Sequence, residues 1–463
     1  MAEQDTICAI ATSAGRAGVG IVRVSGPLVA LIAESVLGQL PQPRQAQFST
    51  FRNRQGLTID KGIALYFPAP ASFTGEDVLE LQGHGGDYVL NTVRQAVLDL
   101  GARHANPGEF SERAFLNNKI DLVQAEAIAD LIDASSRQAA RSAMRTLVGE
   151  FSRRVETLVA AIIKVRVHVE AAIDFPDEEV EIFNDGAVRE SLLSVTADLE
   201  KVRETARQGV ILKKGLNVVI AGAPNAGKSS LLNKLCEADT AIVTDIPGTT
   251  RDILTEQIDI DGLPIHVMDT AGLRVSPDPI EEEGIRRAAN AILKADRILL
   301  VVDSSCEGTL TGQIEQLLEQ TVNKPEETVD LLKRLTVVMN KVDLVGDPPL
   351  EKGFDYQGIC PEVLGLSAKT GEGIADLRNH LKHCAGYSET GEDVFVARER
   401  HLSALESACA LVQQAITALD EGQPAELVAE ELRLCQLELD RITGKFTSDD
   451  LLGEIFSSFC IGK

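Results

Sequence analysis

The chain has 463 residues, and its 45 Lys and Arg against 70 Asp and Glu give a formal net charge of −25. Hydrophobic residues make up 44% and charged residues 25%, which are the proportions of a folded protein with sizeable cores, so a disordered chain or a fibre is excluded. The excess of acidic residues argues against broad, unaided binding to nucleic acid. At roughly 150 residues per domain, the length predicts about three domains.

The cysteines and the N-terminus indicate a cytoplasmic protein. The eight cysteines are scattered and form no C-x-x-C pair, which predicts reduced thiols rather than a disulfide framework or a zinc site. The first residues, Met-Ala-Glu-Gln-Asp, lack the basic-then-apolar order of a signal peptide. No uninterrupted apolar run approaches the roughly 20 residues that cross a bilayer.

Residues 1–118 mix short β-type runs with turn residues. Helices are predicted near 27–38 and 87–101. Strands are predicted at 6–10, 20–25, 61–68 and 77–83. The region is therefore predicted to be an α+β domain.

The rest of the chain alternates between two kinds of pattern. Residues 119–214 and 387–463 carry apolar residues at helical spacing, while 215–386 alternates strands and helices as a parallel α/β sheet does. The economical interpretation is one discontinuous helical domain, with the α/β unit inserted into it.

The start of the α/β unit contains a phosphate-binding loop. An apolar strand at 216–221 runs directly into Gly-Ala-Pro-Asn-Ala-Gly-Lys-Ser, and a helix follows, which is the setting that the motif requires. The glycines let backbone N–H groups point at phosphates, Lys228 can reach the terminal phosphates, and Ser229 is placed to bind Mg²⁺. The predicted nucleotide contacts here are Asn225, Ala226, Gly227, Lys228, Ser229 and Ser230.

Two further motifs are predicted to recognise the base. The first follows the strand at 335–339, and its Asp343 carboxylate can accept two hydrogen bonds from guanine that adenine cannot supply. The second follows the run at 363–366 and completes the base pocket. The predicted contacts are Asn340, Lys341, Asp343, Ser367, Ala368 and Lys369.

Two more motifs are predicted to sense the terminal phosphate and its Mg²⁺. A hydroxyl at Thr250 must reach the metal, Asp269 can hold the metal's shell, and the Gly272 N–H can meet the last phosphate. The predicted contacts are Thr244, Asp245, Ile246, Pro247, Gly248, Thr249, Thr250, Asp269, Thr270, Ala271 and Gly272. Five elements in this order predict a GTP site with a Ras-like α/β fold.

The residue that orients the attacking water is not the usual glutamine. Its position holds Leu273, whose side chain cannot form a hydrogen bond. A carboxylate in the following acidic segment, 280–284, can orient the water. For Glu282 and Glu283, a charge cluster at a helix N-terminus is an equally good interpretation.

These motifs resemble the translation-factor-related GTPases with a hydrophobic residue in place of the catalytic glutamine. Over essentially the whole chain, Phe-Ser-Glu-Arg-Ala-Phe-Leu-Asn-Asn-Lys at 110–119, the helical flanks and the terminal Cys-Ile-Gly-Lys resemble the tRNA wobble-uridine modification GTPases. The resemblance implies that the N-terminal domain dimerises and binds 5-formyl- or 5,10-methylene-tetrahydrofolate. It implies folate contacts at Arg23, Glu80, Lys119 and Lys463.

The resemblance also implies activation by potassium, with Asn225, Thr244, Ile246 and Thr249 as ligands, and Glu281 as the water-positioning residue. The implied partner is the flavoprotein MnmG, in a heterotetramer that adds an aminomethyl or carboxymethylaminomethyl group to C5 of the tRNA wobble uridine, with tRNA held largely by the partner. Two alternatives stay open. The chain can instead be a regulatory GTPase of ribosome assembly, and Cys460 can be catalytic or, as we favour, a packed structural cysteine.

Overall fold

The computed structural model describes residues 5–13, 15–134, 136–174, 186–237, 255–269, 289–305, 310–321, 325–345, 354–387, 394–445, 449–457, 459–460 and 462. The chain divides into two compact units, Met1–Ile132 with Met144–Val202 and Ser403–Lys463, and Asp133–Ala143 with Arg203–Leu402. This division does not decide the predicted boundaries at 118, 214 and 386, which stay predictions.

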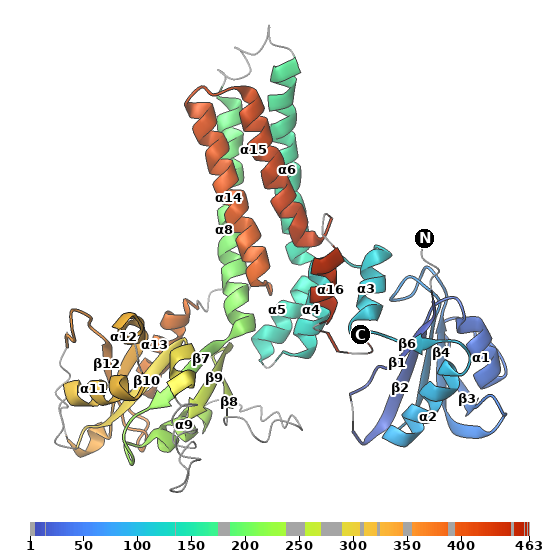
Figure 1. Ribbon diagram of the computed structural model, residues 1–463, viewed down its shortest axis with the longest axis horizontal. Coiled ribbons are helices and arrows are strands. Elements are labelled where there is room, and N and C mark those ends of the chain that lie inside the picture. Colours follow the sequence, from blue (N-terminus) through green and yellow to red (C-terminus); the bar gives the residue numbers. More distant parts are fainter. Residues whose placement is uncertain are drawn as a thin grey trace. The chain divides into compact units, whose positions relative to one another are not determined.

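The N-terminal part of the first unit is a six-stranded sheet in the order β3-β4-β5-β2-β1-β6 (Figure 1). Helices α1 (Val29–Leu37) and α2 (Asp87–Leu98) share one apolar core with the sheet. The strands are β1 (Ile7–Ile10), β2 (Ala17–Ser25), β3 (Gln47–Arg52), β4 (Thr58–Phe67), β5 (Val78–Gly85) and β6 (Arg103–His104).

Four of these strands and both helices lie where the sequence predicts them, and two strands were missed. The edge strand β6 has only two residues, too few for any periodic pattern. The other edge strand, β3, is mainly polar, and its Phe48 is exposed while Phe51 is buried. The α+β prediction is nevertheless confirmed.

The two-residue repeat of the strands divides their side chains between the two faces of the sheet. Val22 and Val24 of β2 and Leu79 of β5 enter the core beneath the helices. Arg23 and Glu80 alternate with these residues and are cross-strand partners in the antiparallel β2–β5 pair. They therefore lie together on the face opposite α1 and α2, where Phe110 packs against Ile7 and Ala9.

Four long helices form a bundle, α6 (Glu150–Asp174), α8 (Ala187–Lys214), α14 (Glu399–Asp420) and α15 (Ala425–Thr443) (Figure 1). Arg166 of α6 donates to Gln436 of α15 at 2.8 Å, and Arg189 of α8 pairs with Asp420 of α14 at 2.8 Å. Helices from both sides of the α/β insert thus pack together, which confirms the discontinuous helical domain. The shorter helices are α3 (Glu109–Leu116), α4 (Leu122–Ile132), α5 (Arg137–Leu147) and α16 (Asp449–Ser457).

Among the helices of the described part, α14 alone is long and apolar enough, by length and composition, to cross a membrane. Its buried residues recur every three to four positions, as in a helix with one face in a core. They include Leu405, Ala408, Val412 and Ala415, and the Cys435 thiol of α15 donates to the Ala408 carbonyl at 3.5 Å. The apolar composition of α14 is therefore that of a bundle core.

The second unit contains a sheet in the order β12-β11-β10-β7-β9-β8, parallel except for β8. Val218 and Ile220 of β7 join a core with α9 and α13, while Val219 joins a core with α11 and α12, so helices cover both faces. The strands are β7 (Leu216–Ala221), β8 (Thr255–Ile260), β9 (Leu263–Asp269), β10 (Arg297–Asp303), β11 (Leu335–Asn340) and β12 (Glu362–Gly365), and the helices are α9 (Lys228–Glu237), α11 (Leu310–Thr321), α12 (Pro325–Lys333) and α13 (Ile374–Ala385). The predicted α/β fold is confirmed, with one antiparallel strand, β8, added to the expected parallel sheet.

Candidate nucleotide site and a second charged site

The loop after β7 needs glycine at two positions. Gly222 has φ +136°, and a Cβ there would lie 2.2 Å from the carbonyl oxygen of Val301 on β10. Gly227 has φ +96°, and its Cβ would lie 2.2 Å from Nδ2 of Asn340. Both conformations and both contacts exclude a side chain. The loop therefore sits tightly at the carboxyl ends of β7 and β10, where open α/β sheets bind their ligands.

Lys228 begins α9 and is 7% exposed. Its Nζ donates to the carbonyl oxygens of Gly222 and Ala223, both at 2.8 Å, so the ammonium group lies inside the curl of the loop. Ser229 and Ser230 follow on the exposed first turn of the helix. A buried cation and a helix N-terminus favour an anion at this place, and the Ser229 hydroxyl suits the oxygen coordination of Mg²⁺.

Asn340 connects the phosphate loop with the two segments that are predicted to recognise the base, 340–343 and 367–369 (together called the base loops). It is 2% exposed, and its Nδ2 donates to the carbonyl oxygen of Ala226 at 2.8 Å. Its Oδ1 accepts from the backbone N–H groups of Lys341 at 2.8 Å and Ala368 at 3.0 Å. One side chain thus sets three segments of the predicted site relative to one another.

Lys341 makes a second connection to the phosphate loop. Its Nζ donates to the carbonyl oxygen of Asn225 at 2.9 Å and pairs with Asp303 at 2.6 Å. Burial raises the pKa of the Asp303 carboxyl, but hydrogen bonds from Lys341 and Ser305 outweigh burial and lower that pKa to about 2. Asp303 is therefore charged at neutral pH. We did not predict its role, although its place at the end of β10, opposite Asn340, is the available signal.

The first base loop, 340–343, presents the exposed carboxylate of Asp343. Asp343 lies in the short 3₁₀ helix Val342–Leu344, and its side chain is exposed. Ser367 is fully buried and accepts from the N–H of Thr370 at 3.1 Å, while Lys369 is exposed. Asp343 is thus available to a ligand, and Ser367 shapes the loop.

A second charged site lies on the face of the N-terminal sheet opposite α1 and α2. Arg23 and Glu80 form an ion pair of 2.9 Å, with 24% and 14% of their side chains exposed. The guanidinium group lies 5.7 Å from the ring centre of the buried Phe110 and 5.9 Å from that of Phe73. Gln82 donates to the other oxygen of Glu80 at 3.3 Å. The structure thus joins two of the four implied folate contacts.

Lys119 reaches the same neighbourhood through the loop 68–77, which carries Phe73. Its Nζ donates to the carbonyl oxygen of Pro70 at 2.9 Å, and Asn117 donates to that of Thr74 at 2.7 Å. Thr74 also bonds to Ser25 of β2 at 2.8 Å. The loop is therefore held on one side by residues that follow α3 and on the other by β2 of the sheet.

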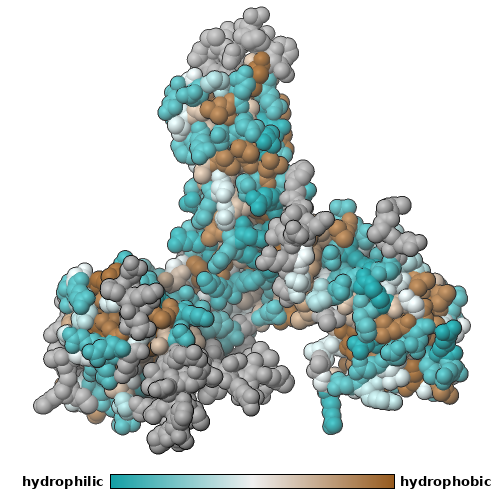
Figure 2. All heavy atoms as spheres, viewed as in Figure 1, coloured by the Kyte–Doolittle hydropathy of each residue, from teal (hydrophilic) through white to brown (hydrophobic). Residues whose placement is uncertain are grey.

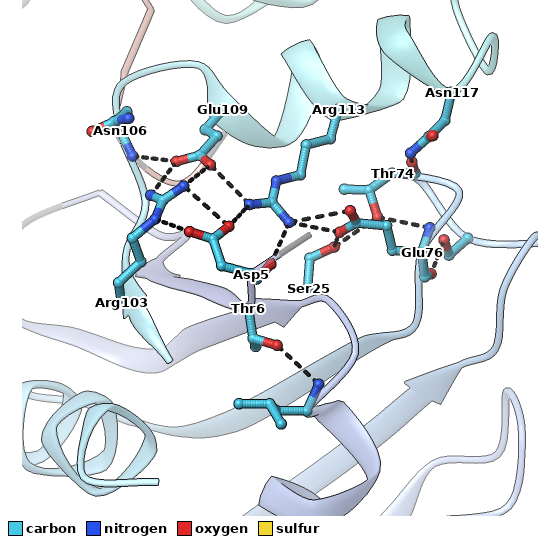
Figure 3. A network of polar contacts seen from close by, with 12 residues as sticks. Asp5, Thr6, Ser25, Thr74, Glu76, Arg103, Asn106, Glu109, Arg113 and Asn117 are labelled. Carbon is cyan, nitrogen blue, oxygen red and sulfur yellow. Dashed lines mark hydrogen bonds and ion pairs between the residues drawn. The ribbon is translucent and has the colours of Figure 1, made fainter. Parts of the chain in front are cut away.

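The anchor of this loop is a network of charges, shown in Figure 3. Glu76 binds Arg113 at 3.0 Å and accepts from the Ser25 hydroxyl at 2.7 Å. Arg113 also pairs with Asp5 at 2.7 Å and Glu109 at 2.9 Å. Arg103 joins the same two carboxylates at 2.5 and 2.6 Å. Two arginines and three carboxylates thus lock the end of the loop to strand and helix.

The comparisons with known proteins decide the family. Residues 122–460 match the family model of the MnmE helical domain, and residues 6–119 match that of the GTP-binding protein TrmE N-terminus. The chain belongs to the MnmE family of tRNA modification GTPases. The tRNA modification GTPase MnmE of Coxiella burnetii is 53% identical over 459 residues, or 99% of each chain. That of Yersinia pseudotuberculosis is 55% identical over 467 residues and all of both chains.

For a member of the MnmE family, the described residues hold only part of the predicted site. Asp269 ends β9 beside Ile220, and only its backbone is described. The other predicted contacts that lie outside the described residues are Thr244, Asp245, Ile246, Pro247, Gly248, Thr249, Thr250, Thr270, Ala271, Gly272, Glu281 and Lys463. Of the implied K⁺ ligands, Asn225 alone is among the described residues; it is exposed, with φ +62°.

One interpretation of this MnmE-family sequence was wrong. Cys460 is exposed rather than packed, because its neighbour Phe459 takes the buried position against Phe456. The carbonyl oxygen of Cys460 accepts from the N–H of Gly108 at 3.4 Å. The missed residues around the second site are Phe73 and Glu76, together with Phe110 and Arg113, which we had used only as part of the motif at 110–119.

Proposed function

We propose that the chain is a potassium-activated GTPase that acts with the flavoprotein MnmG on tRNA. Together they add an aminomethyl or carboxymethylaminomethyl group to C5 of the wobble uridine, and a tetrahydrofolate derivative carries the one-carbon unit. The observation that carries the proposal is the Asn340 connection, which holds the phosphate loop and the guanine-binding loop in one frame and leaves Asp343 exposed to a base. Membership of the MnmE family supports the tRNA part.

Hydrolysis of GTP to GDP and phosphate uses the residues of the α/β unit. Lys228 and the N–H groups of the phosphate loop bind the phosphates. Mg²⁺ at Ser229 and Thr250, and K⁺ at Asn225, Thr244, Ile246 and Thr249, supply positive charge against the phosphates when bound. We assign the orientation of the attacking water to Glu281, since Leu273 has no hydrogen-bonding group.

We assign the folate to the second charged site. The Glu80 carboxylate can accept hydrogen bonds from the donor edge of a pterin, while Arg23, Lys119 and Lys463 can meet its acceptors and carboxylates. The partial exposure of both Arg23 and Glu80 supports this assignment, because a fully buried ion pair offers nothing to a ligand.

A homodimer in the cytoplasm is the proposed form of the chain. Figure 2 shows apolar surface on the N-terminal part, and the exposed large side chains of that part include Phe48 and Ile63, which are partners in the β3–β4 pair. An exposed apolar pair on a sheet face favours association. With a net charge of −25, this chain is proposed to leave most phosphate contacts of the tRNA to MnmG.

The test exchanges the nucleotide. In Asp343→Asn the carboxylate that accepts from guanine becomes an amide, which suits xanthine, so GTP-driven modification of wobble uridine with MnmG should fall and XTP should restore it. Asp355→Asn, an exposed aspartate elsewhere in the same unit, is the matched control and should keep GTP preference. Unchanged use of GTP by Asp343→Asn, or no modification by the natural chain with MnmG, would overturn the proposal.

A further inference from the structure

The loop 68–77 carries one aromatic ring that faces solvent. Phe73 is 38% exposed, whereas Thr74 beside it is fully buried and Glu76 is 9% exposed. A single exposed ring is common on protein surfaces and means little by itself. The place of this ring is unusual, because it borders a partly exposed ion pair and belongs to a loop that is fixed on both sides.

The fixation of the loop decides where the ring can be. Lys119 holds the carbonyl oxygen of Pro70 before Phe73, and Asn117 holds that of Thr74 after it. Glu76 is bound by Arg113 and Ser25 in the network of Figure 3. All of these contacts are made between residues of the chain itself. A ligand that met the ring would therefore not have to order the loop, and a preorganised group binds more strongly.

The ring lies beside the groups that would bind the edge of a flat ligand. The Arg23 guanidinium group lies near both Phe110 and Phe73, with centroid distances of 5.7 and 5.9 Å. Phe110 is fully buried and supports the guanidinium group, whereas Phe73 keeps exposed surface. A flat ligand whose ring edge forms hydrogen bonds with Glu80 and Arg23 has two ring faces that make no hydrogen bonds. An aromatic side chain packs well against such a face.

We propose that Phe73 stacks on the pyrimidinone ring of the pterin, and this inference rests on the proposed folate site. Phe73 then selects a flat heterocycle, while Glu80 and Arg23 select its hydrogen-bonding edge. Two other roles for the Phe73 ring would give different results in the experiments below. It can merely hold Arg23 in place, or a second copy of the chain can cover it.

The chain contains no tryptophan, so Phe73→Trp creates a single fluorophore at the proposed contact. Titration of the full-length variant with 5-formyltetrahydrofolate should quench its emission, with the Kd that calorimetry gives. Tyr88→Trp is the matched control, because Tyr88 is 85% exposed on α2, the helix that packs on the opposite face of the sheet. Binding by calorimetry without quenching, or equal quenching in the control, would overturn the stacking.

A second pair of variants separates stacking from support of Arg23. Phe73→Leu keeps apolar bulk against the guanidinium group but loses the π-face, so its Kd for 5-formyltetrahydrofolate should rise about tenfold, while Phe73→Tyr should stay within about twofold of the natural chain. Tyr88→Leu, at an exposed aromatic residue of α2 on the opposite face of the sheet, should leave the Kd unchanged.

The outcomes distinguish this inference from the folate proposal beneath it. If the natural chain does not bind 5-formyltetrahydrofolate, both are overturned. If it binds and Phe73→Leu binds equally well, only the role of Phe73 is overturned. Emission of Phe73→Trp that changes with protein concentration and not with folate would show that a second copy covers the ring, and would also overturn the inference.

Discussion

The phosphate loop and the loop 68–77 are both fixed near charged groups, but by different means. The phosphate loop takes its shape within one stretch, 222–229, from two positive-φ glycines and from Lys228 bonding to carbonyl oxygens of its own loop, and Asn340 and Lys341 then bond to it. The loop 68–77 is held by side chains from distant positions such as Ser25 and Arg113. A motif thus describes the first site, and only the tertiary fold describes the second.

The difference also concerns what each cation does. Lys228 bonds to two carbonyl groups, which carry partial charge, at a place where a helix N-terminus favours an anion. Arg113 binds three carboxylates, those of Asp5, Glu76 and Glu109. A cation that is already matched by carboxylates stabilises the fold and has little attraction left for a ligand. We therefore assign Arg113 to structure, and we assign Lys228 to phosphate binding from its place in the motif at the start of α9.

The largest expected effect comes from Arg113→Leu. The change leaves Glu76 and Glu109, both less than a tenth exposed, without their central partner. Breaking a buried network in this way costs about 3–5 kcal/mol of unfolding free energy. Urea unfolding of the full chain, with hydrogen exchange of the 68–77 peptide, measures the loss.

Arg189→Leu is the matched control for that substitution. Its ion pair with Asp420 is about half exposed on both sides, so we expect no measurable change in either readout. Equal losses in the two variants would show that burial of the network around Arg113 is not what stabilises the loop.

The next effect tests the phosphate loop. Gly227→Ala places a Cβ 2.2 Å from Asn340 Nδ2 at a φ that L-residues rarely adopt, so the connection between phosphate and base loops must shift. We expect GTP affinity to fall about 100-fold, or about 2.7 kcal/mol, in a fluorescent-nucleotide titration. Folate binding should be unchanged.

Gly453→Ala is the control for a glycine change, since nothing lies within 4 Å of its Cβ position and its φ is not positive. It should bind GTP as the natural chain does. Normal affinity in Gly227→Ala would mean that the close packing of Gly227 against Asn340 is not needed for the nucleotide site.

The same contrast explains how far the sequence could predict the molecule. Gly222, Gly227 and Lys228 could be assigned because they belong to one motif of eight consecutive residues, although Gly222 and Gly227 also pack against the distant Val301 and Asn340. Arg23 and Glu80 were reached only through the family resemblance, since a charged residue on a strand has no local signature. Their register across β2 and β5 depends on the tertiary pairing of the sheet.

Phe73 and Arg113 show the limit of prediction most clearly. The partners of Arg113 lie 108, 37 and 4 positions away along the chain, and no periodic pattern connects them. Asp303 lies between these cases, because a carboxylate at the end of a parallel strand is recognisable once the sheet order is known. Local chemistry is thus predictable, and long-range charge pairing is not.

The smallest expected effect is a pH dependence in the network. Burial raises the pKa of Glu109, but hydrogen bonds from Arg103, the Asn106 N–H and Arg113 outweigh it, so the pKa lies below its usual range. A carboxyl whose pKa is lowered on folding stabilises above its unfolded pKa of about 4.3, and this contribution is lost as the pH falls through the lower folded pKa. Glu109→Gln should therefore be less stable than the natural chain by about 1–2 kcal/mol at pH 7, and the gap should narrow below about pH 4. Glu430→Gln, in an exposed pair with Arg433, should show no such gap, and a Glu109→Gln gap that stayed constant to pH 3 would contradict the role of the ionised carboxylate.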